Sequence, residues 1–152
     1  MKKKIYIFSF IFLIIDFISK IIIQNYMTLN SSIPIIKNFF SITYVKNIGA
    51  AFSILSGKQL FLIILGIIIL IGIIYYVNKD KLNNLKVIYY SLLIGGIIGN
   101  LIDRIIYNSV IDFLDFKIFG YDYPIFNLAD TFICIGVILI IIESIIGGKN
   151  GN

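Results

Sequence analysis

Carboxylate and ammonium side chains interrupt several apolar runs of this sequence. Asp16 and Lys20 lie in the first run, and Asp130 lies near the start of the last one. A charged side chain within hydrocarbon costs about 2.5 to 3.5 kcal/mol on insertion scales, so it needs a partner or a task. Two carboxylates a few ångströms apart cannot both ionise cheaply, so such a pair can supply a general acid and a general base.

Two polar stripes have helical spacing. Asp16 and Lys20 are separated by four residues and share one helix face, whereas Asn100, Asp103 and Arg104 form a second stripe that follows several glycines. A purely structural interpretation stays open for both stripes. The first would be a self-neutralising pair, and the second would be packing contacts plus an arginine that snorkels outward.

Two further acids could join this polar layer. Asp130 lies about one turn into the last run, behind Asn127, which is a plausible N-cap. Asp112 could reach the layer if its segment folds back over the bundle. The alternatives are a carboxylate favoured by the helix dipole for Asp130 and a solvated loop acid for Asp112. Asp115 and Asp122 are weaker candidates, because acids outside the hydrocarbon cost nothing special.

Other reaction classes have less support. The chain has no histidine, which excludes a His-based triad and a His-containing zinc site, and its single cysteine, Cys134, is expected to be a small buried packing residue. A Ser–Lys hydrolase could use Lys20 with Ser19 or Ser53, although neighbouring helical residues such as Ser19 and Lys20 point about 100° apart. A small transporter or ion channel is another alternative, because intramembrane acids also mark proton relays.

The composition indicates a membrane protein. Of the 152 residues, 59% are hydrophobic and 14% are charged, and the mean hydropathy is +0.99, which is too apolar for a soluble domain. A spanning helix needs about 20 mostly apolar residues. We therefore expect a mainly α, polytopic protein, a single domain over residues 1–152 that forms a four-helix transmembrane bundle. The expected spans are residues 5–26, 60–77, 87–106 and 128–146.

Lysines concentrate at both chain ends and in the second connection between spans, so the positive-inside rule predicts that both termini are cytoplasmic. The net charge of +5 is explained by this topology, and no nucleic-acid partner is expected. Residues 27–59 and 107–127 then lie outside. Each contains a β-prone stretch, at 39–45 and 110–116, and we expect the two stretches to pair as a small sheet at the outer membrane surface.

The order of these residues resembles the lipoprotein signal peptidases, also called type II signal peptidases. The resemblance covers nearly the whole chain. It rests on Asp16 and Lys20, and on NIGAAF at 47–52, GNLIDR at 99–104, VIDF at 110–113 and FNLAD at 126–130.

The resemblance implies that Asp112 and Asp130 are catalytic, and that the outer segments form a β-cradle. It also implies substrate-binding or supporting roles for Asp16, Lys20, Asn47, Gly49, Ala51, Asn100, Arg104, Asn127 and Ala129.

The implied protein is an aspartic endopeptidase of the bacterial cytoplasmic (inner) membrane. It would remove signal peptides from diacylglyceryl-modified prolipoproteins by cutting on the N-terminal side of the lipidated cysteine. Its aspartates would activate water by acid/base chemistry, with no metal or organic cofactor. The implied partners are the prolipoprotein, membrane lipids and globomycin-type cyclic lipopeptide inhibitors.

Overall fold

The computed structural model describes residues 1–50 and 54–149 of the chain. Within these residues, four helices are long and apolar enough to cross a membrane, which confirms the predicted fold class. They are α1 (Lys2–Tyr26), α2 (Gln59–Lys79), α3 (Asn84–Tyr107) and α4 (Leu128–Lys149). Each predicted span lies inside one of these helices.

Helix α3 forms the core of the bundle, because α1, α2 and α4 all pack against it. In the most apolar 18-residue stretch of α3, 72% of the residues are buried. The corresponding share is 22% for α1 and 11% for both α2 and α4. Small residues allow this close packing. A Cβ atom at Gly95 would lie 2.7 Å from the Ser9 carbonyl oxygen of α1, and one at Gly96 would lie 2.5 Å from the Ala129 carbonyl oxygen of α4.

An antiparallel sheet accounts for the extended segments. Its strands, in spatial order, are β1 (Ser32–Ile36), β2 (Phe40–Asn47), β3 (Val110–Ile118) and β4 (Tyr121–Asp122). The predicted pairing of the two β-prone stretches is confirmed, since β2 pairs with β3 in a register that places Val45 opposite Asp112. Strands β1 and β4 were not predicted from the sequence. Pro34 lies in β1, at the edge of the sheet, where a missing N–H is tolerated.

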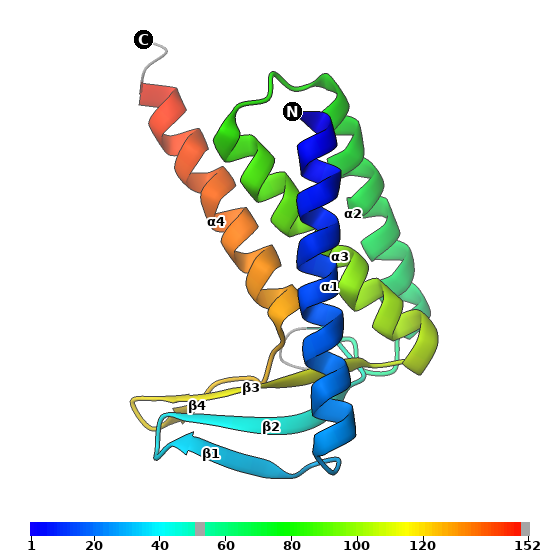
Figure 1. Ribbon diagram of the computed structural model, residues 1–152, viewed down its shortest axis with the longest axis vertical. Helices are drawn as coiled ribbons and strands as arrows, with labels where there is room; N and C mark the ends of the chain where they lie inside the picture. Colours follow the sequence, from blue (N-terminus) through cyan, green and yellow to red (C-terminus); the bar gives the residue numbers. More distant parts are fainter. Residues whose placement is uncertain (51–53, 150–152) are drawn as a thin grey trace.

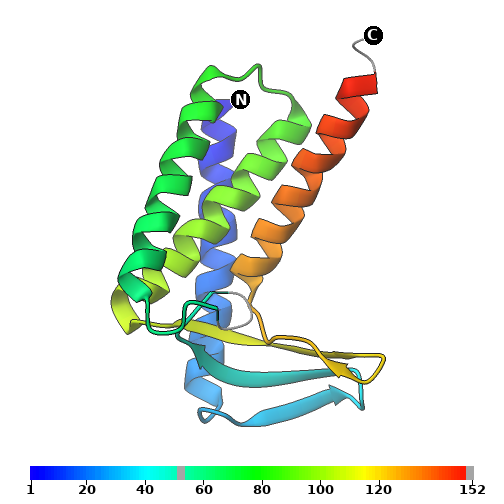
Figure 2. The same cartoon turned by 180° about the vertical axis from the view of Figure 1, so that it is seen from behind.

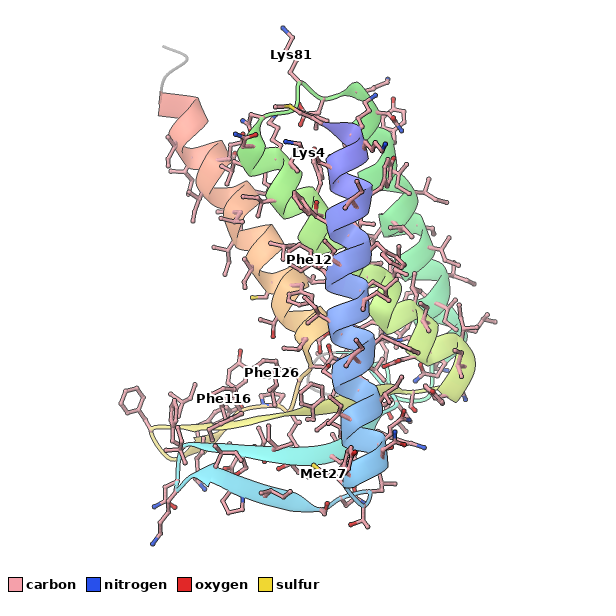
Figure 3. The ribbon with its side chains drawn as sticks, in the orientation of Figure 1. Lys4, Phe12, Met27, Lys81, Phe116 and Phe126 are labelled. Atoms are coloured by element: carbon pink, nitrogen blue, oxygen red, sulfur yellow. The ribbon has the colours of Figure 1, made fainter. Side chains whose placement is uncertain are left out.

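The sheet lies across one end of the bundle, and the start of α1, the α2–α3 connection and the end of α4 lie at the other end (Figures 1 and 2). Lys4 and Lys81 are at this second end, whereas Met27, Phe116 and Phe126 are at the sheet end (Figure 3). The lysine-rich segments of the described chain therefore share one end of the molecule.

A small apolar cluster joins the sheet to the end of α1. Ile111 and Phe113 of β3 are buried with Ile23 of α1 and Tyr44 of β2. Successive strand side chains point to opposite faces, so Asp112 between Ile111 and Phe113 points the other way. The apolar packing of its two neighbours thus aims Asp112 toward the start of α4.

Candidate active site

The start of α4 is shaped by a reciprocal cap between Asn127 and Asp130. The Asn127 Oδ1 accepts a hydrogen bond from the Asp130 backbone N–H at 2.9 Å, and the Asp130 Oδ2 accepts one from the Asn127 backbone N–H at 3.3 Å. This is a capping box, which satisfies two helix-end donors. The predicted N-cap is confirmed. Asp130 is therefore both a carboxylate at the start of a helix and a member of a larger polar cluster.

Asp112 joins the same cluster from the sheet. Its Oδ1 accepts a hydrogen bond from Asn127 Nδ2 at 2.7 Å, and its Oδ2 accepts one from Asn47 Nδ2 at 2.9 Å. The residue is only 1% exposed, so the alternative of a solvated loop acid is wrong. The reason is that β3 folds back under the bundle. Asp112 and Asp130 are therefore brought together around the single side chain of Asn127.

Asn100 connects this pair to the helix core. Its Nδ2 donates to Asp130 Oδ1 at 2.8 Å. Its Oδ1 accepts from Asn127 Nδ2 at 3.1 Å and from Lys20 Nζ at 3.2 Å. The cluster thus spans α1, α3, α4 and β3, which are far apart in sequence.

Lys20 forms two buried ion pairs behind the acids. Its Nζ lies 2.8 Å from Asp16 Oδ2 and 2.9 Å from Asp103 Oδ2, and no side chain of the three is more than 4% exposed. The close approach of Asp16 depends on Gly99, where a Cβ would lie 2.5 Å from Asp16 Oδ2. The interpretation of Asp16 and Lys20 as a self-contained pair was therefore incomplete, because a second carboxylate shares the ammonium.

Both carboxylates that hold Lys20 also hold backbone near the acid pair. The Asp16 Oδ1 accepts a hydrogen bond from the Ala129 N–H at 2.9 Å, and the Asp103 Oδ2 accepts one from the Ile111 N–H at 3.2 Å. Asp103 was predicted to lie in the polar stripe with Asn100 and Arg104, but it was left out of the predicted site residues. Its place three residues after Asn100, on the same helix face, was the signal that could have included it.

Arg104 and Gly49 organise the loop that follows β2. The two terminal guanidinium nitrogens of Arg104 donate to the carbonyl oxygens of Gly49 and Asn100, each at 3.3 Å. The Gly49 N–H donates to Asn47 Oδ1 at 2.8 Å, which turns the amide nitrogen of Asn47 toward Asp112. Arg104 is thus partly buried beside the acids instead of only snorkelling outward.

An open pocket of about 490 Å³ lies beside the acids. Asp112, Asp130, Asn47 and Arg104 supply its polar lining, and the remaining lining residues are Val110, Tyr123, Pro124, Ile125, Phe126, Thr131, Ile133, Cys134 and Ile135. Cys134 is exposed, so the prediction of a buried packing thiol is wrong. Only part of the α4 surface packs against α3, and Cys134 lies on the part that faces the pocket.

Burial has a direct effect on the chemistry of Asp112. Loss of water contact, followed by the nearby charge of Asp130, raises its pKa to about 7. A carboxyl group with such a pKa can exchange a proton near neutral pH. Among residues 1–50 and 54–149, no group of three or more His, Cys, Asp or Glu side chains is placed to hold a metal ion.

The predicted site residues, apart from Ala51, fall within this connected cluster. Ala51 and Ser53 lie outside the described residues. The Ser19–Lys20 pairing is not formed, because the Ser19 hydroxyl donates to the Asp16 carbonyl oxygen at 2.6 Å. Lys20 is instead held between its two carboxylates.

Comparison with known proteins gives a consistent result. A family profile described as signal peptidase (SPase) II matches residues 8–146. The lipoprotein signal peptidase of Staphylococcus aureus strain JH9 is 50% identical over 130 residues, which are 85% of this chain and 80% of that protein.

Two solved structures, each described as a bacterial membrane enzyme, have the same fold. One has a TM-score of 0.92 and 43% identity, and the alignment covers 97% of this chain and 91% of that one. The other has a TM-score of 0.82 and 45% identity, with coverage of 92% and 91%. With its profile match, its half-identical relative and this shared fold, the chain belongs to the signal peptidase II family.

Proposed function

We propose that this chain is an aspartic endopeptidase that removes signal peptides from diacylglyceryl-modified prolipoproteins, with Asp112 and Asp130 as its catalytic pair. The observation that carries the proposal is the convergence of both carboxylates on Asn127 at the wall of one pocket. Asn127 donates to Asp112 at 2.7 Å and shares a capping box with Asp130. Membership of a peptidase family supports the same assignment.

In the proposed reaction, one carboxyl group holds a proton while the other is ionised. We assign the proton to Asp112, because burial and the charge of Asp130 raise its pKa to about 7. Asp130 then takes a proton from water as the water oxygen attacks the scissile carbonyl carbon. Asp112 supplies its proton as the C–N bond breaks, so the products are a carboxyl terminus and a free amine. Asn47, which lines the pocket, holds the Asp112 carboxyl group in place through its hydrogen bond to Oδ2.

The pocket lining suits a substrate that is partly peptide and partly lipid. Its acids, Asn47 and Arg104 lie at one side, and α4 contributes Ile133, Cys134 and Ile135 as a mostly apolar wall. Arg104 brings a positive charge to the polar side of the pocket. We propose cleavage on the N-terminal side of the lipidated cysteine, and inhibition by globomycin-type cyclic lipopeptides that compete for this pocket.

The four apolar helices and the bacterial relatives indicate a bacterial membrane protein. We further propose that both termini face the cytoplasm, because the lysine-rich segments share the end of the bundle opposite the sheet (Figure 1). Single-cysteine variants in a Cys134→Ser background test this orientation. Labelling of position 81 by a membrane-impermeant reagent added outside the cell would overturn it, whereas position 38 should react.

The activity is tested with purified enzyme and two matched precursors, one with a diacylglyceryl-modified cysteine and one with the unmodified cysteine. We expect cleavage of the modified precursor only, and a product whose intact mass places the lipidated cysteine at its new N-terminus. A globomycin-type lipopeptide should block this cleavage. Equal cleavage of both precursors, or a cut at another bond, would contradict the proposal.

A further inference from the structure

Lys20 lies behind the acid pair and hydrogen-bonds to neither member of it. Its ammonium group contacts Asp16, Asp103 and the Oδ1 atom of Asn100, the last at 3.2 Å. Lys20 is only 2% exposed, so a bound substrate in the pocket would not touch it. Lys20 can therefore act on the reaction only through these three neighbours or through the field of its charge.

The chemistry of an ammonium group determines how the Asn100 amide is oriented. An ammonium can only donate hydrogen bonds, so the amide oxygen must face Lys20 and the amide NH2 must face the other way. On that side it donates to Asp130 Oδ1 at 2.8 Å. A reversed amide would bring its oxygen against the Asp130 carboxylate, and its NH2 against both Lys20 and the NH2 of Asn127.

We propose that Lys20 is a positioning residue for the peptidase reaction, which acts through the Asn100 amide to hold Asp130 as a proton acceptor. The inference rests on the proposed function, because it assigns a role within that catalytic pair. A carboxylate that receives a hydrogen bond is stabilised in its ionised form, as a general base must be before it takes a proton from water.

The two carboxylates that hold Lys20 fix it relative to both sides of the site. Asp16 accepts from the N–H of Ala129, the residue before Asp130. Asp103 accepts from the N–H of Ile111, the residue before Asp112. The ammonium position is thus tied to the backbone that carries each catalytic acid. The second carboxylate thus has a role beyond joining two helices.

A double-mutant cycle separates this role from a purely structural one. Lys20→Met and Asn100→Leu should each lower kcat by about 10²-fold, with little change in KM. The first removes the group that orients the Asn100 NH2 toward Asp130, and the second removes that NH2. If Lys20 acts through Asn100, the double variant should be within about threefold of the slower single variant. Multiplicative losses would show that Lys20 acts independently of Asn100 and would overturn the inference.

The pH profile gives a second readout that a structural role would not move. Charged groups near Asp112 are Asp130 on α4, Lys20 on α1 and Arg104 on α3. The charge of Lys20 lowers the pKa of Asp112, so Lys20→Met should move the alkaline limb of kcat/KM to higher pH. Lys20→Arg keeps the charge and the donors, and it should restore the limb and most of kcat. An unchanged limb in Lys20→Met would contradict the inference.

Lys86→Met is the matched control, because it removes an ion-paired lysine at the other end of α3. We expect it to leave kcat, KM and the pH profile within about twofold of wild type, since surface pairs contribute little.

Lys20→Met leaves two buried carboxylates without their cation and could prevent folding. In that case a triple variant with neutral side chains, Asp16→Asn/Lys20→Met/Asp103→Asn, replaces Lys20→Met in the double-mutant cycle. Asn100→Asp is decisive as well, because it keeps an oxygen for Lys20 but offers no NH2 to Asp130. Turnover of Asn100→Asp within about threefold of wild type would overturn the inference. An active Asp130→Asn variant would instead refute the catalytic pair itself.

Discussion

The two ends of α3 carry ion pairs of nearly equal length in different surroundings. At the sheet end, Lys20 lies 2.8 Å from Asp16 and 2.9 Å from Asp103, with side chains at most 4% exposed. At the other end, Lys86 lies 2.7 Å from Asp80, with side chains that are 20% and 25% exposed. The ion pairs at the two ends therefore differ in their access to water and not in their length.

The acids at the two ends respond to these surroundings in opposite directions. A hydrogen bond from Lys86 lowers the pKa of Asp80, and the Tyr90 hydroxyl donates to the same carboxylate at 3.1 Å. At the sheet end, burial and the neighbouring charge of Asp130 raise the pKa of Asp112 to about 7. Only the buried end can therefore keep a carboxyl proton near neutral pH, which an acid–base pair requires.

Removal of ionisable groups should have the largest effect. Asp112→Asn and Asp130→Asn keep the side-chain shape but remove the proposed acid or the proposed base, so each should lower turnover by about 10⁴-fold or more. Asp80→Asn, the matched change at the other end, should leave turnover near wild type. Cleavage of a diacylglyceryl-modified precursor is followed by gel shift in native membranes. Substantial cleavage by either site variant would remove that aspartate from the mechanism.

Stability should distinguish the two ends next. Asp16→Ala removes a partner of Lys20 and the acceptor of the Ala129 N–H, so it should lower the free energy of unfolding by about 3 kcal/mol. Asp80→Ala breaks a partly exposed pair and should cost less than about 1 kcal/mol. Thermal unfolding of both variants in the same detergent measures the difference. Equal losses of stability in the two variants would mean that burial does not make one ion pair more important for stability than the other.

The smallest effect is an opposite pH dependence of stability. The folded pKa of Asp112 is raised, so its stabilising contribution is complete below the usual value of 3.8 and is lost as pH rises through about 7. The folded pKa of Asp80 is lowered, so its contribution is present above 3.8 and is lost as pH falls through the lowered value.

Asp112→Asn, which is neutral at every pH, should therefore gain stability relative to wild type as pH rises from about 4 to about 7, and the difference should be constant above that range. Asp80→Asn should be less stable than wild type near neutral pH, and this difference in stability should shrink as pH falls toward about 3. Thermal midpoints measured across this range are the test. A constant difference between wild type and Asp112→Asn would mean that the pKa of Asp112 is not raised in the folded protein.

The spans were predictable because lipid leaves little choice of structure. Backbone polar groups have no water partner in hydrocarbon, so long apolar runs must form helices. The same constraint made charged residues within these runs conspicuous, and it led to Asp16, Lys20 and Asn100 before any contact was known. The pairing of β2 with β3 followed from two β-prone stretches on the same side of the membrane.

Details that depend on side-chain packing were predicted less well. Asp103 was not included in the site, because its contact with Lys20 joins two helices whose relative rotation cannot be deduced from periodicity. Cys134 was expected to be buried, but α4 turns it toward the pocket. Strands β1 and β4 were missed, because their short sequences have no clear alternation and form only against an existing sheet edge.

The sequence by itself determined the four apolar helices, the shared side of the lysine-rich chain ends and second connection, and the acids and amides that are costly in hydrocarbon. These follow from composition and from solvation in lipid, which act on each segment separately. Only the tertiary structure decided that Asn127 joins Asp112 to Asp130 and that Lys20 orients Asn100. Hydrogen bonds require a direction and a distance of about 3 Å, and only the packing of α1, α3, α4 and β3 against one another provides both.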